Sequence, residues 1–544
     1  MPVSSEPLIE LPLVVRGQAA DSEIQQQPLV PSVAAQHDKN SLWHDFKNIS
    51  HLAVPMALSY TFSWSVFALG PLVSHLKNDS EKREAATALM QVMMNTDIFI
   101  AISPLFAVSI IASKQVGKLE RAQKSNAEPI VLERKRKRIA AINKAGMVIA
   151  GVITPLAILP LACSRELLAV FRQKSAYTAS FFLRPLAGMV PASMFRMVFE
   201  GLMFGFGYTK PAMIIGLIDF FIEMLLAVWL GRGGAGVTGL GVLGIAIAFV
   251  CEAYLTAVLF ALYIAKEKRF SVFPFFHLQN TTWNQVKSLI GKILNLGAPI
   301  SFNLINEMAV TFILSLLAGI VSEEDQALLT TALQPFFILF IWFAAFGQSC
   351  CQEVNRKIGE RDYRAANRLG INGFIITMIY NLPPCLAIMI TPAIPLKILG
   401  THQINARKAE QIARVIAATI PLKAMNYYFL QGLRVLSDVK GSTVVSLAGF
   451  WLTIALAAMS LITKTGIYGI LAADLIGVIF SAAGLGIRWI NRIPSQKTQE
   501  INENPPEEVT WGQYLCSFFS KPDSRGSVRT DEHFHRISSV ASHA

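Results

Sequence analysis

The sequence has little charge for its length. Of its 544 residues, 15% are Asp, Glu, Lys or Arg and 53% are hydrophobic, whereas soluble domains carry about 25% charged residues. The mean hydropathy is +0.46. These values exclude an ordinary soluble globular protein and predict an all-α polytopic membrane protein. The net charge of +12 then belongs to loops that face the cytoplasm and anionic lipid, so we expect no nucleic-acid partner.

Motifs of catalysis and metal binding are absent as well. The sequence has no CxxC, HExxH or GxSxG pattern and no P-loop, so an intramembrane enzyme and an intrinsic ATP-driven pump have little support. The six Cys and nine His residues show neither a disulfide framework nor metal-ligand spacing. We expect no cofactor and no enzymatic activity. Residues 1–40 lack a basic region followed by an apolar one, so no cleavable signal peptide is expected.

Twelve apolar segments dominate what is present. Each is near or above the ~20 residues that cross a bilayer as a helix. They lie at residues 50–76, 86–113, 139–163, 176–206, 211–230, 238–265, 289–320, 328–352, 370–398, 410–436, 441–463 and 466–490. The predicted division is a disordered tail (1–42), an N-terminal six-helix lobe (43–270), a C-terminal six-helix lobe (271–492) and a second disordered tail (493–544).

Basic residues identify the predicted cytoplasmic side. The loops after spans 2, 6 and 8 are rich in Lys and Arg, with the run Arg134–Arg138 in the first, whereas the loop after span 7 contains Glu323, Glu324 and Asp325 without a basic residue. Cytoplasmic loops are enriched in Lys and Arg, so both termini are predicted to be cytoplasmic. We expect a monomer in the plasma (inner) membrane, in contact with lipid.

Four short motifs occur twice, in the same order and at similar offsets. The pairs are Pro55 with Pro299, Gly117 with Gly359, Lys210 with Lys440, and Gly244 with Gly469. This order predicts two homologous six-span halves related by an axis along the membrane normal. Transporters place substrates at the interface of such repeats. The two prolines each remove a backbone hydrogen bond and permit matching kinks.

A lone carboxylate marks the first candidate site. Glu307 is the only formal charge in residues 296–320 and lies near the middle of that segment. A buried carboxylate at this depth faces a water-filled cavity or a partner, so Glu307 is predicted to be a cation or proton site. The alternative is a structural contact between helices.

Two further carboxylates mark a second candidate site. Asp219 and Glu223 are four residues apart, so they share one face of a helix. Two carboxylates held close in low dielectric cannot both ionise cheaply, which predicts a protonatable site near neutral pH. The alternative is a pair satisfied by Arg184, Arg196 or backbone groups.

Lys423 is the least expected charge. If its helix adjoins that of Glu307 the two pair; alternatively Lys423 itself titrates. Asn303 and Asn426 offer neutral hydrogen bonds nearby. Aromatic side chains that could stack on flat or cationic substrates, or simply pack between helices, are Trp64, Trp342, Phe336, Phe337, Tyr427 and Tyr428. The other intramembrane acids, Asp97, Glu252 and Asp474, and the pair Arg196–Glu200 are assigned structural roles.

Four motifs resemble one transporter family. They are GVTGLGVLGIAIA (236–248), LGAPISFNLINE (296–307), EVNRKIGERDYRAANRLG (353–370) and QGLRVLSDVKGS (431–442). Each resembles the pattern of the multidrug and toxic compound extrusion (MATE) family at the same place in the topology, and the similarity covers about residues 50–490. The resemblance implies two six-helix lobes, a central cavity, and export of organic cations or drug-like compounds in exchange for H⁺ or Na⁺.

The sequence departs from this family at two positions. An acid common late in span 1 is missing from Leu69-Gly70-Pro71, and Lys423 stands where many bacterial members have an Asp. Glu307 matches the acid of span 7 and is the expected Na⁺ position if Na⁺ is the coupling ion. Asp219 and Glu223 have the spacing of the family's Asn-x-x-x-Asp in span 5. The coupling ion therefore stays open between H⁺ and Na⁺.

The predicted cation and substrate site comprises Glu307, Asp219, Glu223, Lys423, Asn303 and Asn426. The substrate is predicted to be a small molecule, and no metal other than Na⁺ is expected. The alternative function is a flippase of lipid-linked saccharides or another amphiphile in the same superfamily. A flippase would favour a cationic cavity, so the sign of the charge around the cavity discriminates between the two.

Overall fold

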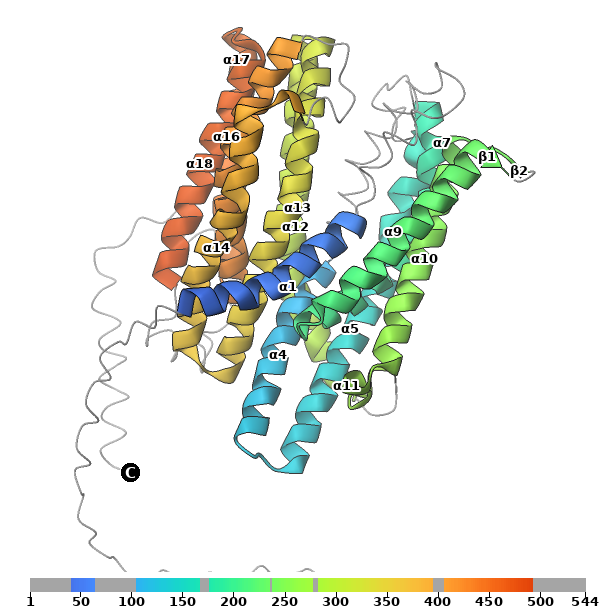
Figure 1. The fold of residues 1–544 in the computed structure, drawn as a ribbon, viewed down its shortest axis with the longest axis vertical. Helices are drawn as coiled ribbons and strands as arrows, with labels where there is room; N and C mark the ends of the chain where they lie inside the picture. Colours follow the sequence, from blue (N-terminus) through green and yellow to red (C-terminus); the bar gives the residue numbers. More distant parts are fainter. Residues whose placement is uncertain are drawn as a thin grey trace, which may run out of the picture. The chain divides into compact units, whose positions relative to one another are not determined.

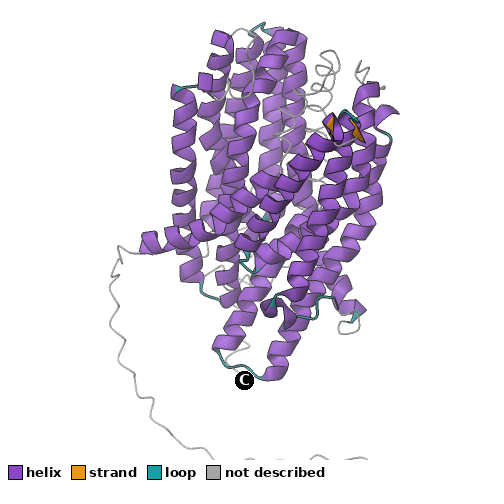
Figure 2. Cartoon of the chain, turned by 45° about the vertical axis from the view of Figure 1, so that its right-hand side comes forward, coloured by secondary structure: helices purple, strands orange, loops and turns teal. Residues whose placement is uncertain are grey.

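The computed structural model describes residues 41–63, 104–166, 176–234, 237–276, 282–394 and 406–492. These residues are predominantly helical (Figures 1 and 2), which confirms the predicted all-α class. Contacts divide the chain into residues 1–43 and residues 44–544, and every contact described below lies within the second unit.

The described residues form sixteen helical elements and one short pair of strands. In chain order the elements are α1 (Ser41–Ser63), η2 (Pro104–Phe106), α4 (Ala107–Lys124), α5 (Pro129–Ala162), α7 (Ala176–Leu186), η3 (Ala187–Met189), α8 (Val190–Gly205), α9 (Thr209–Arg232), α10 (Val242–Lys266), α11 (Lys268–Ser271), α12 (Trp283–Val321), α13 (Glu323–Glu360), α14 (Tyr363–Ile390), α16 (Ala406–Val435), α17 (Val439–Ile462) and α18 (Gly466–Arg492). Between α9 and α10, β1 (Gly233–Gly234) pairs antiparallel with β2 (Val237–Thr238).

Each of the twelve predicted spans coincides, wholly or in part, with a described helix. Among the described residues, eight helices are long and apolar enough to cross a membrane by length and composition, so the protein is an integral, multi-pass membrane protein. Spans 1 and 2 are described only in part, since residues 64–103 lie outside the described residues. Trp64, Leu69–Pro71, Asp97 and the tail residues 1–40 and 493–544 lie outside as well.

Several helices extend beyond the predicted spans. α5 begins at Pro129 rather than near residue 139, and α13 continues to Glu360 rather than ending near 352. Hydropathy detects only the apolar part of a helix. Ion pairs between side chains one turn apart stabilise the polar end of the helix that lies in water. One such pair joins Lys137 Nζ to Glu133 Oε1 at 2.7 Å on α5.

Span 4 is interrupted, although we predicted one helix over 176–206. α7 ends at Leu186, a 3₁₀ turn follows at Ala187–Met189, and α8 begins at Val190. Pro185 and Pro191 flank this turn. Proline has no N–H to donate and clashes with the preceding turn of a helix, so two prolines six residues apart account for the break.

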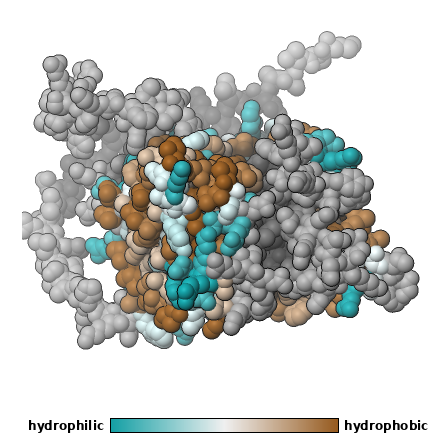
Figure 3. Space-filling model, turned by 90° about the horizontal axis from the view of Figure 1, so that it is seen from above, coloured by the Kyte–Doolittle hydropathy of each residue, from teal (hydrophilic) through white to brown (hydrophobic). Residues whose placement is uncertain are grey.

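The buried apolar side chains form two main cores. The first draws on residues 56–293 with Ala345, and the second on residues 310–473. Each half of the chain thus has its own core, as two six-helix lobes require; the predicted boundary at residue 270 stays a prediction. Large apolar side chains also lie outside the cores, with Val152, Leu156 and Leu159 of α5 62–68% exposed. In the view from above in Figure 3, brown apolar side chains lie on both sides of a band of teal polar ones in the described part of the molecule.

The first helix of each repeat begins against the opposite half. At the start of α1, Asp45 is 2% exposed, accepts a hydrogen bond from Asn372 Nδ2 at 2.7 Å and pairs with Arg368 Nε at 3.2 Å on α14. In the corresponding helix, α12, the early residues Val286 and Ile293 join the N-terminal core. α1 and α12 therefore each connect the two halves, in the same manner, as expected of homologous repeats.

Candidate functional site

Five charged side chains meet inside the N-terminal half. Arg196 and Glu200 come from α8, Asp219 and Glu223 from α9, and Glu252 from α10, and each of the four acidic residues is at most 8% exposed. Arg196 Nη1 lies 3.2 Å from Glu252 Oε1, and Arg196 Nε lies 3.8 Å from Glu200 Oε2. All four carboxyl groups act electrostatically on this guanidinium.

The predicted shared face of the α9 pair is confirmed. Asp219 and Glu223 are each 1% exposed, whereas Phe221 between them is 58% exposed. The helix period places the two carboxyl groups on the buried side. Both belong to the interior cluster of the N-terminal half.

Hydroxyl groups supply part of the hydrogen bonding. Ser59 Oγ of α1 donates to Glu200 Oε1 at 3.5 Å, and Thr256 Oγ1 of α10 donates to Glu252 Oε1 at 3.3 Å. Tyr60, beside Ser59, acts electrostatically on Glu200 and donates to Gln348 Oε1 of α13 at 2.8 Å. The cluster is thus continuous with a contact to the C-terminal half.

Asp219, unlike Glu200 and Glu252, receives no hydrogen bond from a hydroxyl group of the described residues. Neither of its carboxylate oxygens accepts a hydrogen bond from any described residue, although both are buried. The Glu252 carboxyl group lies within hydrogen-bonding reach of Asp219. The structure thus places acidic side chains of α9 and α10 near each other in the buried cluster.

Two interpretations from the sequence need correction here. Arg196–Glu200 is not an isolated structural pair, because Arg196 also binds Glu252. Arg184 does not satisfy the α9 carboxylates; its Nη2 binds Glu166 Oε1 at 2.8 Å, where both side chains are largely exposed. The sequence offered one signal for Glu252, namely an acid within an apolar span, and spacing along the chain cannot show which distant helix it faces.

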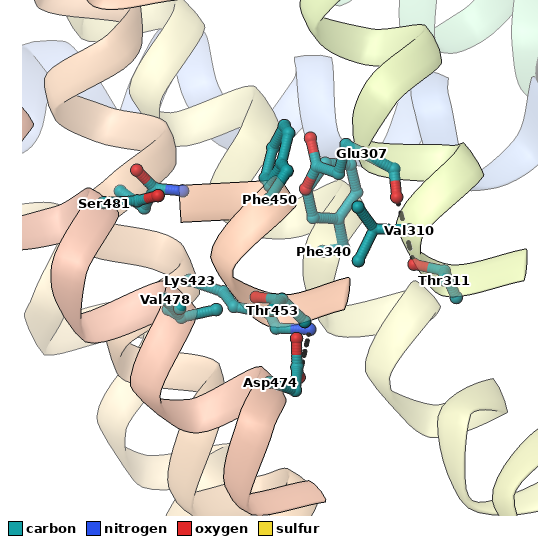
Figure 4. Close-up of a pocket in the computed structure, with 12 residues that line it drawn as sticks. Glu307, Val310, Thr311, Phe340, Lys423, Phe450, Thr453, Asp474, Val478 and Ser481 are labelled. Atoms are coloured by element: carbon teal, nitrogen blue, oxygen red, sulfur yellow. Dashed lines mark hydrogen bonds and ion pairs between the residues drawn. The ribbon is translucent and has the colours of Figure 1, made fainter. Parts of the chain in front are cut away.

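A second polar site lies in the C-terminal half. A pocket between α12, α13, α16, α17 and α18 is lined by Glu307, Val310, Thr311, Phe340, Lys423, Asn426, Phe450, Thr453, Asp474, Gly477, Val478 and Ser481. Figure 4 shows the Glu307 side chain entering the pocket from α12 while Lys423 reaches toward Asp474. The space at its centre, about 30 Å³, suits water or a small ion rather than a drug-sized molecule.

The ion-pair partner of Lys423 differs from the one considered from the sequence. Its Nζ lies 2.8 Å from Asp474 Oδ2 of α18, with side-chain exposures of 17% and 15%. Glu307 faces the same pocket and is acted on electrostatically by Lys423, Asp474 and Arg434. Asp474, assigned a structural role from the sequence, is therefore part of the candidate site.

The predicted neutral and aromatic groups divide between the pocket and the core. Asn426 lines the pocket, whereas Asn303, one turn before Glu307, is buried but is not among the lining residues. Tyr428 is 2% exposed and donates to the Gly370 carbonyl at 2.6 Å, so it packs in the core. Tyr427 packs edge-on against Phe340 of the pocket wall. Trp342 is a partly buried packing residue; the side chains of Gln334, Phe336 and Phe337 lie outside the described ones.

The chain was compared with known proteins. The MatE family model matches residues 299–459, which contain Glu307, Lys423 and Asn426. A probable multidrug resistance protein NorM of Bradyrhizobium diazoefficiens is 25% identical over 471 residues, or 83% of this chain and 94% of that protein. By these matches the chain resembles the MATE family. A shorter alignment with NorM of Vibrio cholerae is 28% identical and covers 32% of this chain and 38% of that relative.

Solved MATE structures share the fold. The eukaryotic MATE transporter AtDTX14 superposes with a TM-score of 0.69 at 16% identity, covering 84% of this chain and 99% of that one. A transporter from Pyrococcus furiosus, described by a reversed polarity of its binding pocket, superposes with a TM-score of 0.68 at 17% identity, covering 82% and 96%. The chain thus has the fold of these solved transporters.

Proposed function

We propose that this protein is a secondary transporter that exports organic cations or drug-like compounds in exchange for H⁺. The observation that carries the proposal is the buried Asp219 carboxylate, which lacks a donor among the described residues and lies beside Glu252. A proton between these two carboxyl groups is the coupling ion. The Arg196 guanidinium offsets part of the remaining negative charge of the cluster.

In this proposal, the proton and the cationic substrate compete for the same carboxylates. Four carboxyl groups face one guanidinium among the described residues of the cluster, so the deprotonated site has an excess of negative charge and attracts a cation. Protonation removes that charge and releases the cation. Exclusion of one cation by the other is what an exchanger requires, because simultaneous binding would give no coupling.

The sign of the buried charge favours this function over the flippase alternative. The N-terminal cluster has four acids and one cation, and the C-terminal pocket is lined by two acids and one cation. An anionic lipid head group would be repelled by such an excess of carboxylates. Relatives named multidrug resistance protein NorM support drug-like compounds as the substrate class.

A reconstituted assay tests the proposal. The purified full-length protein is placed in proteoliposomes, and accumulation of ethidium is followed under an imposed H⁺ gradient and, separately, an imposed Na⁺ gradient. We expect the H⁺ gradient alone to drive accumulation. Asp219→Asn should lower that rate at least tenfold, whereas Glu166→Gln, an exposed acid paired with Arg184, should leave it unchanged.

Two outcomes would contradict the proposal. One is transport driven by Na⁺ in the absence of a pH difference. The other is an Asp219→Asn protein with the same rate and the same pH profile as the wild type. The amount of protein in the vesicle membrane is measured in parallel, so that loss of transport is not confused with loss of protein.

A further inference from the structure

The C-terminal pocket is lined by oxygen atoms from several helices. Glu307 and Asp474 supply carboxylates, Asn426 an amide carbonyl and Ser481 a hydroxyl. Asn426 Oδ1 and Ser481 Oγ are buried and have no hydrogen-bond partner among the described residues. Hard cations are held by such sets of carboxylate, carbonyl and hydroxyl oxygens. By its ligands the pocket is suited to one monovalent cation.

A cation is already present in this pocket. The Lys423 ammonium enters from α16 and lies 2.8 Å from Asp474 Oδ2, and its charge also acts on Glu307 (Figure 4). Without it, two carboxylates would share a largely buried space of about 30 Å³ with no positive charge among the lining residues. Such an arrangement is unfavourable in low dielectric. Lys423 therefore supplies the positive charge for which the surrounding oxygens are arranged.

We propose that the Lys423 ammonium is a built-in cation of this pocket: it excludes free Na⁺ while it is present, and its removal leaves a site that binds Na⁺ or a small alkylammonium ion. A second monovalent cation would lie within a few ångströms of the ammonium, and the two would repel each other strongly.

This assignment bears on coupling, a consequence that rests on the proposed function. If Lys423 permanently fills the C-terminal pocket, the exchanged ion binds elsewhere. The Asp219–Glu252 pair of the N-terminal half is then the site of the exchanged proton. The binding of Na⁺ to the pocket can be measured without transport, so the two proposals fail independently.

Thermal unfolding of the purified full-length protein tests the inference. The unfolding midpoint is compared in NaCl, methylammonium chloride and choline chloride at equal ionic strength. We expect no Na⁺-specific change in the wild type or in Lys287→Ala, which removes an exposed lysine of α12. In Lys423→Ala, Na⁺ or methylammonium should raise the midpoint by about 2–4 °C at a concentration tenfold above Kd. Adding Asp474→Asn should abolish that rise.

The wild-type measurement stands by itself, whatever the stability of the variants. A Na⁺-specific rise in the wild type that disappears in Glu307→Gln would overturn the proposal, and so would a Lys423→Ala protein indifferent to both cations. If Lys423→Ala is recovered only from buffers with Na⁺ or methylammonium, the proposal is supported. If Lys423→Ala is recovered from no buffer, Lys423→Gln is measured instead, because Gln keeps a hydrogen-bond donor without the charge. A cation-specific rise of its unfolding midpoint supports the proposal, and indifference to both cations overturns it.

Discussion

Gly117 of α4 and Gly359 of α13, which the sequence pairs as a predicted repeat, lie against each other. A Cβ atom on Gly359 would be 3.2 Å from the Gly117 Cα, and a Cβ on Gly117 would be 2.1 Å from the Arg356 backbone oxygen. Charged pairs flank this contact: Arg356 Nε donates to Glu120 Oε2 at 2.7 Å, and Lys124 Nζ lies 3.1 Å from Glu360 Oε2. The two halves of the chain therefore meet backbone to backbone at this point.

The first prediction concerns this glycine contact. Gly117→Ala should force α4 and α13 apart, because the added methyl group meets backbone atoms that cannot move aside. We expect the free energy of unfolding to fall by about 1–3 kcal/mol, which is typical of overpacking. The transport rate should fall at least tenfold. Gly151→Ala on α5 is the control, since a Cβ there meets nothing within 4 Å. Equal unfolding midpoints for the two variants would show that the helices do not require this approach.

The second prediction concerns the partner of Lys423. Asp474→Asn should leave the Lys423 ammonium without its ion-pair partner. The free energy of unfolding should fall by about 3 kcal/mol, as when one partner of a buried pair is removed. Glu307→Gln should lower the free energy of unfolding by less than about 1 kcal/mol, because Lys423 keeps its contact with Asp474. Unfolding midpoints of the two variants measure the difference. The opposite order of stability would mean that Glu307 is the principal partner.

The third prediction concerns a basic group beyond the membrane. Lys118 follows the predicted end of span 2 at residue 113, and burial together with Lys114, Arg138, Lys135 and Lys292 lowers its pKa to about 8. At pH 8 about half of this amine is neutral, against less than about 1% of an ordinary lysine with a pKa near 10.4.

Acylation followed by mass spectrometry checks this pKa. Labelling of Lys118 should rise through a midpoint near pH 8, and Arg138→Gln should move that midpoint upward, since a neighbouring positive charge is removed. A wild-type midpoint above pH 10 would contradict the proximity of these basic groups.

The fourth prediction is topological. The enrichment of basic residues places Lys135 on the cytoplasmic side and Glu324 on the opposite one. Single cysteines at these positions, in a background without the exposed Cys163 and Cys251, should react differently with a membrane-impermeant maleimide added to intact cells. Only the cysteine at position 324 should be labelled. Equal labelling of both would rule out the twelve-span arrangement.

Much of the fold follows from local features of the sequence. The apolar segments predicted twelve helical spans because burial in a bilayer demands about 20 apolar residues in a row. The four-residue spacing of Asp219 and Glu223 placed both on the buried face of α9 because that spacing is close to the helix period. The repeats predicted two equivalent halves, and Gly117 and Gly359, which one predicted repeat pairs, lie against each other.

Contacts between distant helices were decided only by the tertiary structure. Lys423 binds Asp474 of α18, a residue 51 positions further along the chain, and Arg196 joins Glu252 of α10 to Glu200. Hydropathy identifies that these charges lie within apolar segments, yet partner choice depends on the rotation and depth of each helix against its neighbours. Those variables are set by the packing of many apolar side chains at once, so no local pattern in the sequence reports them.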